Sequence, residues 1–259
     1  MQIRFLGTGT SYGVPRLRCR CAVCASTDPR NRRRRTSALV ESGGRALLID
    51  VGPDFRAQAL DAGLERLDAV FVTHFHADHV FGLDDLRGLT DDVPAALPVV
   101  APPEAADELA RVFPYIFVKR PYAGLANLSL VRIEDGGTAD VGGFRLSAFA
   151  APHGKVRSFG LRTGGLGYLV DVHAVPDSAI DALRGVDTLV LDLLQLEPHP
   201  THLSRDLAVE AARKIGARAT WFVHMSHDVD HATVDAGLPD GMRLAYDGLV
   251  VDVRDVSGS

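Results

Sequence analysis

The chain has 259 residues, with 28 lysines and arginines against 33 aspartates and glutamates, and its formal net charge is −5. Its composition, 46% hydrophobic and 24% charged, is that of a globular protein long enough to bury a full core. It lacks an apolar run of about 18 residues and the start of a signal peptide, so we expect no membrane span. The mild acidic balance argues against a stable nucleic-acid partner.

Strand-like and helical patterns alternate along the chain. The predicted strands are 2–6, 36–41, 46–50, 69–73, 98–101, 128–133, 144–149, 158–163, 166–171, 188–192, 219–224 and 249–253. The predicted helices are 53–62, 103–112, 176–183 and 204–215. Strand clusters with interleaved helices in both halves predict an α/β fold of two helix-covered sheets, in one domain spanning 1–259.

The strongest local signal is the hexapeptide His74-Phe75-His76-Ala77-Asp78-His79, directly after the predicted strand 69–73. Side chains two apart in an extended chain point the same way, so His74 and His76 can reach one metal ion together. Asp78 and His79 follow where the chain turns toward a helix, so they can reach a second point a few ångströms away. The pattern predicts a two-metal platform at the end of a strand.

A two-metal site needs further ligands, and three residues stand where later strands finish. They are His153, Asp171 and His224. Each alone can equally be a structural residue. Together they supply the residue types that divalent ions bind, from separate strand ends of the second half, and this favours a metal site.

The cysteines form one cluster, Cys19-x-Cys21-x₂-Cys24, in a Pro/Arg-rich loop of about residues 13–35. Their odd number and close spacing exclude a disulfide framework and favour a reducing cytoplasm. Three thiolates this close suit a structural, tetrahedral zinc ion, whereas three unrelated free thiols are the alternative. Spacing alone does not name a fourth ligand. His227 is the best candidate, because it lies just beyond His224.

The hexapeptide matches in full the His-x-His-x-Asp-His signature of the metallo-β-lactamase superfamily, which the chain resembles. The resemblance implies an αβ/βα four-layer sandwich of two mixed sheets flanked by helices, with the site at one edge. It implies two divalent ions, one held by His74, His76 and His153, the other by Asp78, His79 and His224, with Asp171 as the bridge. A superfamily aspartate at an early strand end is matched by Asp50, which we expect to support a ligand rather than bind metal.

Within the superfamily, the chain is similar to the PhnP-like cyclic phosphodiesterases. The similarity rests on stretches spread over nearly the whole chain, namely Gly7-Thr8-Gly9, Gly13-Val14-Pro15, the cysteine cluster, residues 74–83, Pro152-His153, the pair His224 and His227, and Tyr246-Asp247-Gly248. It implies hydrolysis of 5-phosphoribosyl 1,2-cyclic phosphate to ribose 1,5-bisphosphate by a hydroxide that the two ions share. Another small phosphorylated sugar or a cyclic nucleotide is equally compatible with these residues.

PhnP-like enzymes also use a histidine between the bridging aspartate and the last histidine ligand as proton donor. His202 matches by its place before the predicted helix 204–215, and His199 is the competitor. The resemblance therefore makes His202 and the ligand Asp78 the expected catalytic residues. Zinc and manganese both suit a His/Asp site. A homodimer is a common state of small hydrolases.

Other functions of the same fold remain open. A 2′,3′-cyclic nucleotide phosphodiesterase is one alternative. Glyoxalase II and a ribonuclease Z-like nuclease both keep a bridging aspartate, but neither explains the cysteine cluster. A β-lactamase with a cysteine ligand is disfavoured, because no cysteine follows Cys24. A non-catalytic PqqB-like binding or carrier protein would hold only the structural zinc. Its hexapeptide is expected to be degraded, whereas the one here is intact.

The basic run Arg30-Asn31-Arg32-Arg33-Arg34-Arg35 precedes the predicted strand 36–41. For most of it we expect a solvated face, although one or two arginines could grip a substrate phosphate. No aromatic residue interrupts the run, which argues against a single-stranded nucleic-acid platform.

Overall fold

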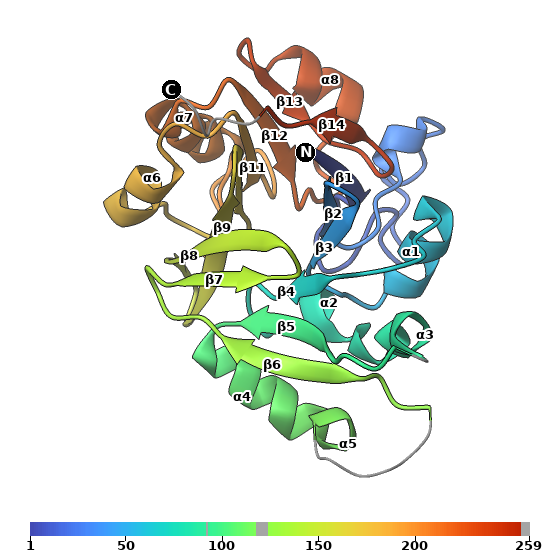
Figure 1. Cartoon of the computed structure of the whole chain (residues 1–259). Coiled ribbons are helices and arrows are strands. Elements are labelled where there is room, and N and C mark those ends of the chain that lie inside the picture. Colours follow the sequence, from blue (N-terminus) through green and yellow to red (C-terminus); the bar gives the residue numbers. More distant parts are fainter. Residues whose placement is uncertain (92, 118–123, 255–259) are drawn as a thin grey trace.

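Alternating side chains along the strands bury both faces of each sheet. In β3 (Arg45–Ile49), Leu47 and Ile49 enter the core between two sheets, whereas Ala46 and Leu48 pack under helices. This period of two is expected for strands that are covered on both sides. The computed structural model describes residues 1–91, 93–117 and 124–254. It is a four-layer sandwich of two sheets flanked by helices, so the predicted fold class is confirmed (Figure 1).

The first sheet has seven strands in the order β14-β1-β2-β3-β4-β5-β6. Besides β3, its strands are β1 (Gln2–Gly7), β2 (Ser37–Ser42), β4 (Ala69–Phe71), β5 (Leu97–Ala101), β6 (Leu128–Arg132) and β14 (Val250–Asp252). Strands β3 to β6 run parallel to one another, and β14, β1 and β2 complete the sheet with antiparallel pairs.

The second sheet also has seven strands, in the order β13-β12-β11-β10-β9-β8-β7. Its strands are β7 (Thr138–Val141), β8 (Phe144–His153), β9 (Val156–Thr163), β10 (Leu166–Leu169), β11 (Thr188–Asp192), β12 (Ala219–Val223) and β13 (Met242–Leu244). Strands β10 to β13 are parallel, whereas β7, β8 and β9 form an antiparallel meander.

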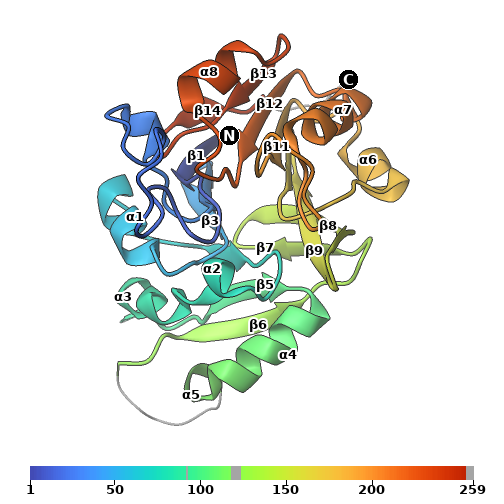
Figure 2. The same cartoon turned by 180° about the vertical axis from the view of Figure 1, so that it is seen from behind.

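Helices cover the outer face of each sheet (Figure 2). The helices are α1 (Phe55–Ala62), α2 (Ala77–Val80), α3 (Arg87–Thr90), α4 (Pro103–Val112), α5 (Pro114–Phe117), α6 (Asp177–Leu183), α7 (Arg205–Ile215) and α8 (His231–Ala236), with 3₁₀ turns η1 (Pro29–Asn31) and η2 (Leu83–Leu86). Within the described ranges, no helix has the length and apolar character that a bilayer crossing requires.

Most predicted elements are present, and α4 has the predicted bounds. Three differences are informative. Helix α1 begins at Phe55, so Pro53 precedes it. Strand β8 continues to His153, because it pairs with β9 as far as the His153–Val156 register. The strands β7 and β13 and the helices α3, α5 and α8 were not predicted, since each has only three to six residues.

The basic run does not form one solvated face. Arg33 is only 2% exposed, and its guanidinium donates to the carbonyls of Ser226, at 3.0 Å, and Val229, at 2.8 Å. Arg34 and Arg35 form ion pairs with carboxylates on α1 and just before it. The run therefore ties the N-terminal loop to the segment after β12.

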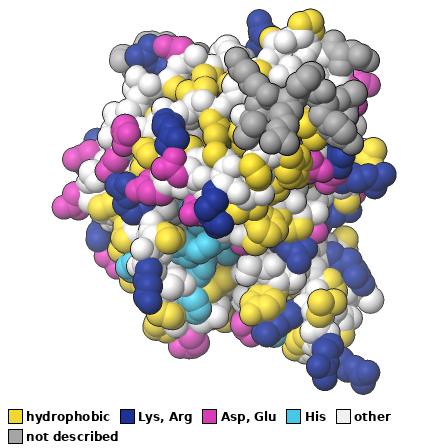
Figure 3. Space-filling view, turned by 90° about the horizontal axis from the view of Figure 1, so that it is seen from below, with side chains coloured by type: hydrophobic (Ala, Val, Ile, Leu, Met, Phe, Trp, Pro, Cys, Tyr) yellow, Lys and Arg dark blue, Asp and Glu magenta, His cyan; other side chains and the backbone are white. Residues whose placement is uncertain are grey.

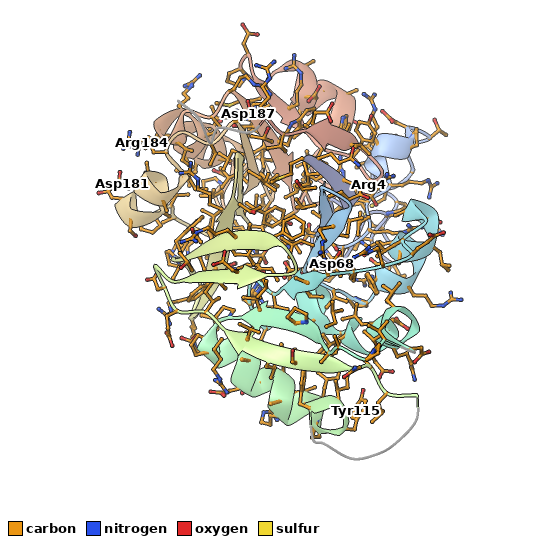
Figure 4. All side chains as sticks on the ribbon, viewed as in Figure 1. Arg4, Asp68, Tyr115, Asp181, Arg184 and Asp187 are labelled. Atoms are coloured by element: carbon orange, nitrogen blue, oxygen red, sulfur yellow. The ribbon has the colours of Figure 1, made fainter. Side chains whose placement is uncertain are left out.

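A buried carboxylate stabilises the sheet end remote from the histidines. Asp187, labelled in Figure 4, accepts two hydrogen bonds from Arg218, at 2.7 and 3.0 Å, and one from the backbone of Arg254. The Arg218 guanidinium is the main reason that the pKa of Asp187 is lowered to about 2. A lowered carboxyl pKa contributes stability that is complete above the unfolded value near 4 and disappears as pH falls through the folded value.

We expect Asp187→Asn to lower the free energy of unfolding by about 1–2 kcal/mol at pH 7, because hydrogen bonds to an ionised group are lost. The deficit should shrink as pH falls from 4 toward 2. Urea unfolding at several pH values measures it. Asp181→Asn is the matched control, because its pair with Arg184 is exposed on both sides and should contribute little (Figure 4). Equal losses in both variants would contradict the assignment.

Candidate metal centre

Three strand ends near the hexapeptide carry an unusual backbone conformation. Asp50 after β3, Asp171 after β10 and His224 after β12 have φ values of 59°, 56° and 61°. In the described part of the chain, only one other non-glycine residue, Arg18, has a positive φ. Aspartate and histidine tolerate this region better than most residues, and such strain gathers at functional sites. The kinks turn these three side chains toward one edge of the sandwich.

The first cluster of ligand atoms joins the hexapeptide to β8 and β10. His76 Nδ1 lies 2.8 Å from His74 Nε2 and 3.1 Å from His153 Nε2. Asp171 Oδ2 lies 3.7 Å from the same atom of His74 and 3.6 Å from that of His153. All four ligand atoms lie within 4.8 Å of one another, close enough to surround one ion.

The second cluster shares Asp171 with the first. His79 Nε2 lies 3.2 Å from Asp78 Oδ2 and 3.4 Å from Asp171 Oδ2. His224 Nε2 lies 3.1 Å from the other oxygen of Asp171 and 3.6 Å from Asp78. The structure thus brings together all seven predicted dinuclear ligands, with Asp171 between the two clusters.

The chemistry of these groups fits divalent cations. His79 Nε2, His224 Nε2 and Asp171 Oδ1 are buried and have no hydrogen-bond partner, a costly state that an ion would relieve. Burial opposes charge on His79, yet Asp78, Asp171 and Asp50 together raise its pKa well above the ordinary value. So much negative charge around one buried imidazole indicates a site built for a cation.

Hydrogen bonds orient two of the imidazoles. His79 Nδ1 lies 2.6 Å from Asp50, which also accepts from the backbone N–H of Thr73 at 2.8 Å. His153 Nδ1 lies 2.9 Å from the carbonyl of Thr201. With each Nδ1 donating, both Nε2 lone pairs face the clusters, as metal binding requires. Asp50 touches a candidate ligand and belongs to neither cluster.

Close backbone packing fixes Asp78. A Cβ added to Gly52 would lie 2.0 Å from the Asp78 carbonyl, so only glycine allows the loop after β3 to approach this closely. The backbone N–H of Val51 also donates to the carbonyl of His79 at 2.8 Å. The two loops therefore hold the start of α2 as one unit.

The three cysteines meet His227 in a separate cluster. Nδ1 of His227 lies 3.2 Å from Cys19 Sγ and 3.4 Å from Cys21 Sγ, and all four ligand atoms lie within 4.8 Å. The backbone N–H of Cys24 is the main cause, followed by His227, that lowers the pKa of Cys21 to about 6. A thiolate at neutral pH is the form that binds zinc. These residues fit a closed tetrahedral site.

We expect Cys21→Ser to remove about one zinc ion per chain and to lower the unfolding temperature by several degrees, because zinc-binding energy contributes to folding. Zinc content and thermal unfolding, each with and without a chelator, measure the effect. Arg20→Ala, an exposed neighbour in the same loop, is the control. Unchanged zinc content in Cys21→Ser would contradict a zinc site here.

The two competing histidines occupy different places. The ring of His202 lies 4.8 Å from that of His153 and 4.9 Å from that of His224, and it lines a cavity of about 360 Å³ beside the two clusters. The ring of His199 lies 5.3 Å from that of His202, and His199 does not line this cavity. Figure 3 shows histidines gathered in a hollow of the surface, with basic side chains at its edge.

A buried carboxylate that sequence reasoning missed supports His202. Asp192 Oδ2, at the end of β11, lies 3.4 Å from His202 Nδ1. Burial opposes charge on His202, but Asp192 and Asp171 raise its pKa above the ordinary value. Asp192 ends a strand, as Asp50 and Asp171 do, so the same signal could have found it. The sequence gives no indication of the role of Thr201, because its backbone carbonyl and not its side chain contacts His153.

Comparisons with known proteins agree with this fold. The family model described as "Beta-lactamase superfamily domain" matches residues 45–225. The crystal structure of a "New Diphosphatase from the PhnP Family" is 39% identical, with a TM-score of 0.91 over 98% of each chain.

Two curated relatives are matched over part of their length. An octanoyltransferase of Porphyromonas gingivalis is 34% identical over 99% of this chain and 53% of its own length. A ribonuclease Z of Bradyrhizobium sp. (strain ORS 278) is 31% identical over 51% of this chain and 44% of its own length. The chain thus spans about half the length of these relatives. Together, the family model and the full-length structural match place the chain in the metallo-β-lactamase superfamily, within its PhnP-like branch.

Proposed function

We propose that this protein hydrolyses a phosphorus–oxygen bond of a small cyclic phosphodiester, with 5-phosphoribosyl 1,2-cyclic phosphate as the first candidate. The observation that carries the proposal is Asp171 shared between two ligand clusters, with His202 beside them in one cavity. Divalent zinc or manganese ions bound there would neutralise phosphoryl charge and activate water near neutral pH.

The chain's own residues contribute orientation and a proton. Asp50 and the Thr201 carbonyl hold two imidazoles in the required tautomer. A water oxygen forms the new bond to phosphorus, the bond to the leaving oxygen breaks, and His202 gives a proton to that oxygen. Asp192 keeps His202 protonated and oriented before the transfer. Solvent then restores the proton of His202.

A second candidate is the diphosphate bond of a small linear substrate. The 39% identical relative with a TM-score of 0.91 is named a diphosphatase, and this observation favours it. The cleaved bond is again phosphorus to oxygen, so the same residues serve. The activity named for the Porphyromonas relative is not proposed here, because about half of that protein lies outside the match.

A substrate panel tests the proposal. Protein reconstituted with zinc or with manganese is incubated with cyclic phosphates, linear diphosphates, a β-lactam and a thioester, and with Asp78→Ala as the inactive control. We expect turnover on the cyclic phosphates, which the control lacks. Turnover on diphosphates alone would replace the first candidate by the second. If neither phosphate class reacts, or if the control matches the parent protein, the proposal fails.

A further inference from the structure

His224 differs from His79 and His153 in what orients its ring. The Nδ1 atoms of His79 and His153 each have a hydrogen-bond partner, the carboxylate of Asp50 and the carbonyl of Thr201. Nδ1 of His224 is buried, and no residue in the described part of the chain bonds it. The direction of this ring therefore depends on the backbone that carries it and on the rings that it stacks against.

The backbone of His224 has a conformation that its surroundings must impose. Its φ of 61° lies in the left-handed region, which a residue with a Cβ keeps only where neighbouring contacts hold it. Directly after it, the backbone N–H of Met225 donates to the carbonyl of Thr8 at 2.9 Å. The N–H of Thr10 donates to the carbonyl of Met225 at 3.1 Å. The segment that follows His224 therefore helps to set the direction of its ring.

The buried side chain of Arg33 fixes the next part of this segment. One guanidinium nitrogen donates to the carbonyl of Ser226 at 3.0 Å. The other donates to the carbonyl of Val229 at 2.8 Å and to Asn31 Oδ1 at 2.9 Å. Loss of the guanidinium would leave buried carbonyls without a donor, which is unfavourable. Because His227 lies between Ser226 and Val229 in the chain, Arg33 holds the histidine of the cysteine cluster from both sides.

We propose that Arg33 is a positioning residue that couples the cysteine cluster to the second cluster, so that an ion in either one raises the affinity of the other. With His227 bound at the cysteines and Arg33 on both sides of it, the segment holds His224 in its left-handed conformation. Such a coupling is reciprocal by thermodynamic necessity. The first cluster takes no ligand from this segment, so its affinity should not depend on Arg33. The inference goes beyond the proposed function, because it concerns metal binding and not the substrate.

Calorimetric titration with Mn²⁺ tests the inference. Thiolates favour zinc and carboxylates suit manganese, so Mn²⁺ reports on the other two clusters while zinc stays at the cysteines. His76→Ala protein keeps the second cluster intact, and Asp78→Ala protein keeps the first. We expect Arg33→Met to raise the Kd for Mn²⁺ about 10-fold in the His76→Ala background and to leave it unchanged in the Asp78→Ala background. Arg32→Met, an exposed neighbour in the basic run, is the matched control and should change neither Kd.

A second measurement tests the coupling without changing Arg33, in case Arg33→Met does not fold. Cys21→Ser, combined with His76→Ala, removes a ligand of the cysteine cluster and should raise the Kd for Mn²⁺ by a similar factor. In the reverse direction, competition with a zinc-selective chelator should show tighter zinc binding at the cysteines when Mn²⁺ fills the second cluster. Reciprocity requires the same factor in both directions.

The outcomes separate this inference from the proposed function. Equal weakening of Mn²⁺ binding in both backgrounds overturns the role of Arg33, because it indicates a general loss of structure. An unchanged Kd in the His76→Ala background, with either Arg33→Met or Cys21→Ser, also overturns it. No substrate enters these titrations, so the coupling stands even if no phosphate ester is hydrolysed, and hydrolysis without coupling refutes this inference alone.

Discussion

Replacement of Asp171 by alanine is expected to lower kcat/KM on the best panel substrate by at least about 10³-fold. Asp171 faces three candidate histidine ligands through one oxygen and a fourth through the other, so its loss opens both clusters at once. Charge stabilisation of phosphoryl transfer accounts for an effect of this size. Steady-state kinetics and metal content of the purified variant measure it.

Asp187→Asn is the matched control for Asp171→Ala. Both aspartates are buried, but Asp187 bonds Arg218 and not the ligand clusters. The control should therefore lose stability and keep turnover. In Asp171→Ala, the zinc of the cysteine cluster should remain, because its ligands are separate. Parent-like turnover and metal content in Asp171→Ala would contradict the shared cluster.

The second large effect is expected for His202→Ala, a loss of about 10²–10⁴-fold in kcat on a substrate with a poor leaving group. On a p-nitrophenyl ester the loss should be small, because that leaving group needs no proton. Protonated His202 is the active form, so parent activity should fall as pH rises through the raised pKa of His202. This alkaline limb should be absent from the pH profile of the variant.

His199→Ala distinguishes the two histidines. The side chain of His199 is not part of the cavity lining, so its substitution should leave kcat and the alkaline limb in place. The reverse result, a large loss in His199→Ala and none in His202→Ala, would transfer the proton donor to His199.

The division of the hexapeptide ligands between two clusters could be predicted from the sequence, because it depends only on local spacing. Two residues along an extended chain return a side chain to the same side, and the next turn begins a helix, so His74 and His76 separate from Asp78 and His79 without any long-range contact. The other candidate ligands, at the ends of β8, β10 and β12, are predicted only from the rule that the ends of strands with the same direction lie at one edge of a sheet. That rule predicts the edge but not the distances between the ligand atoms.

Other features depend on contacts that a linear pattern does not carry. Arg33 resembles its exposed neighbours in sequence, yet it is buried because carbonyls of the segment after β12 accept its hydrogen bonds. The pairing of β8 with β9 extends to His153, and it places the turn between the two strands at residues 154–155. The sequence pattern predicted a strand that ends at residue 149, so it did not predict this turn. Short elements such as β13 form because they pair with a neighbouring strand, here β12.

The two candidate metal sites share one short segment. His224 belongs to the second ligand cluster and His227 to the cysteine cluster, and the backbone of Met225 between them bonds Thr8 and Thr10. Only Met225 and Ser226 therefore separate the cysteine cluster from the second ligand cluster along the chain.

Metal content of the purified, reconstituted protein tests the central claim most directly. Two ions at the clusters that share Asp171 and one at the cysteine cluster predict about three metal ions per chain by elemental analysis, falling to about one in Asp171→Ala. About one ion per chain in the parent protein, unchanged by Asp171→Ala, would contradict a dinuclear centre and favour a binding or carrier protein with a structural zinc alone.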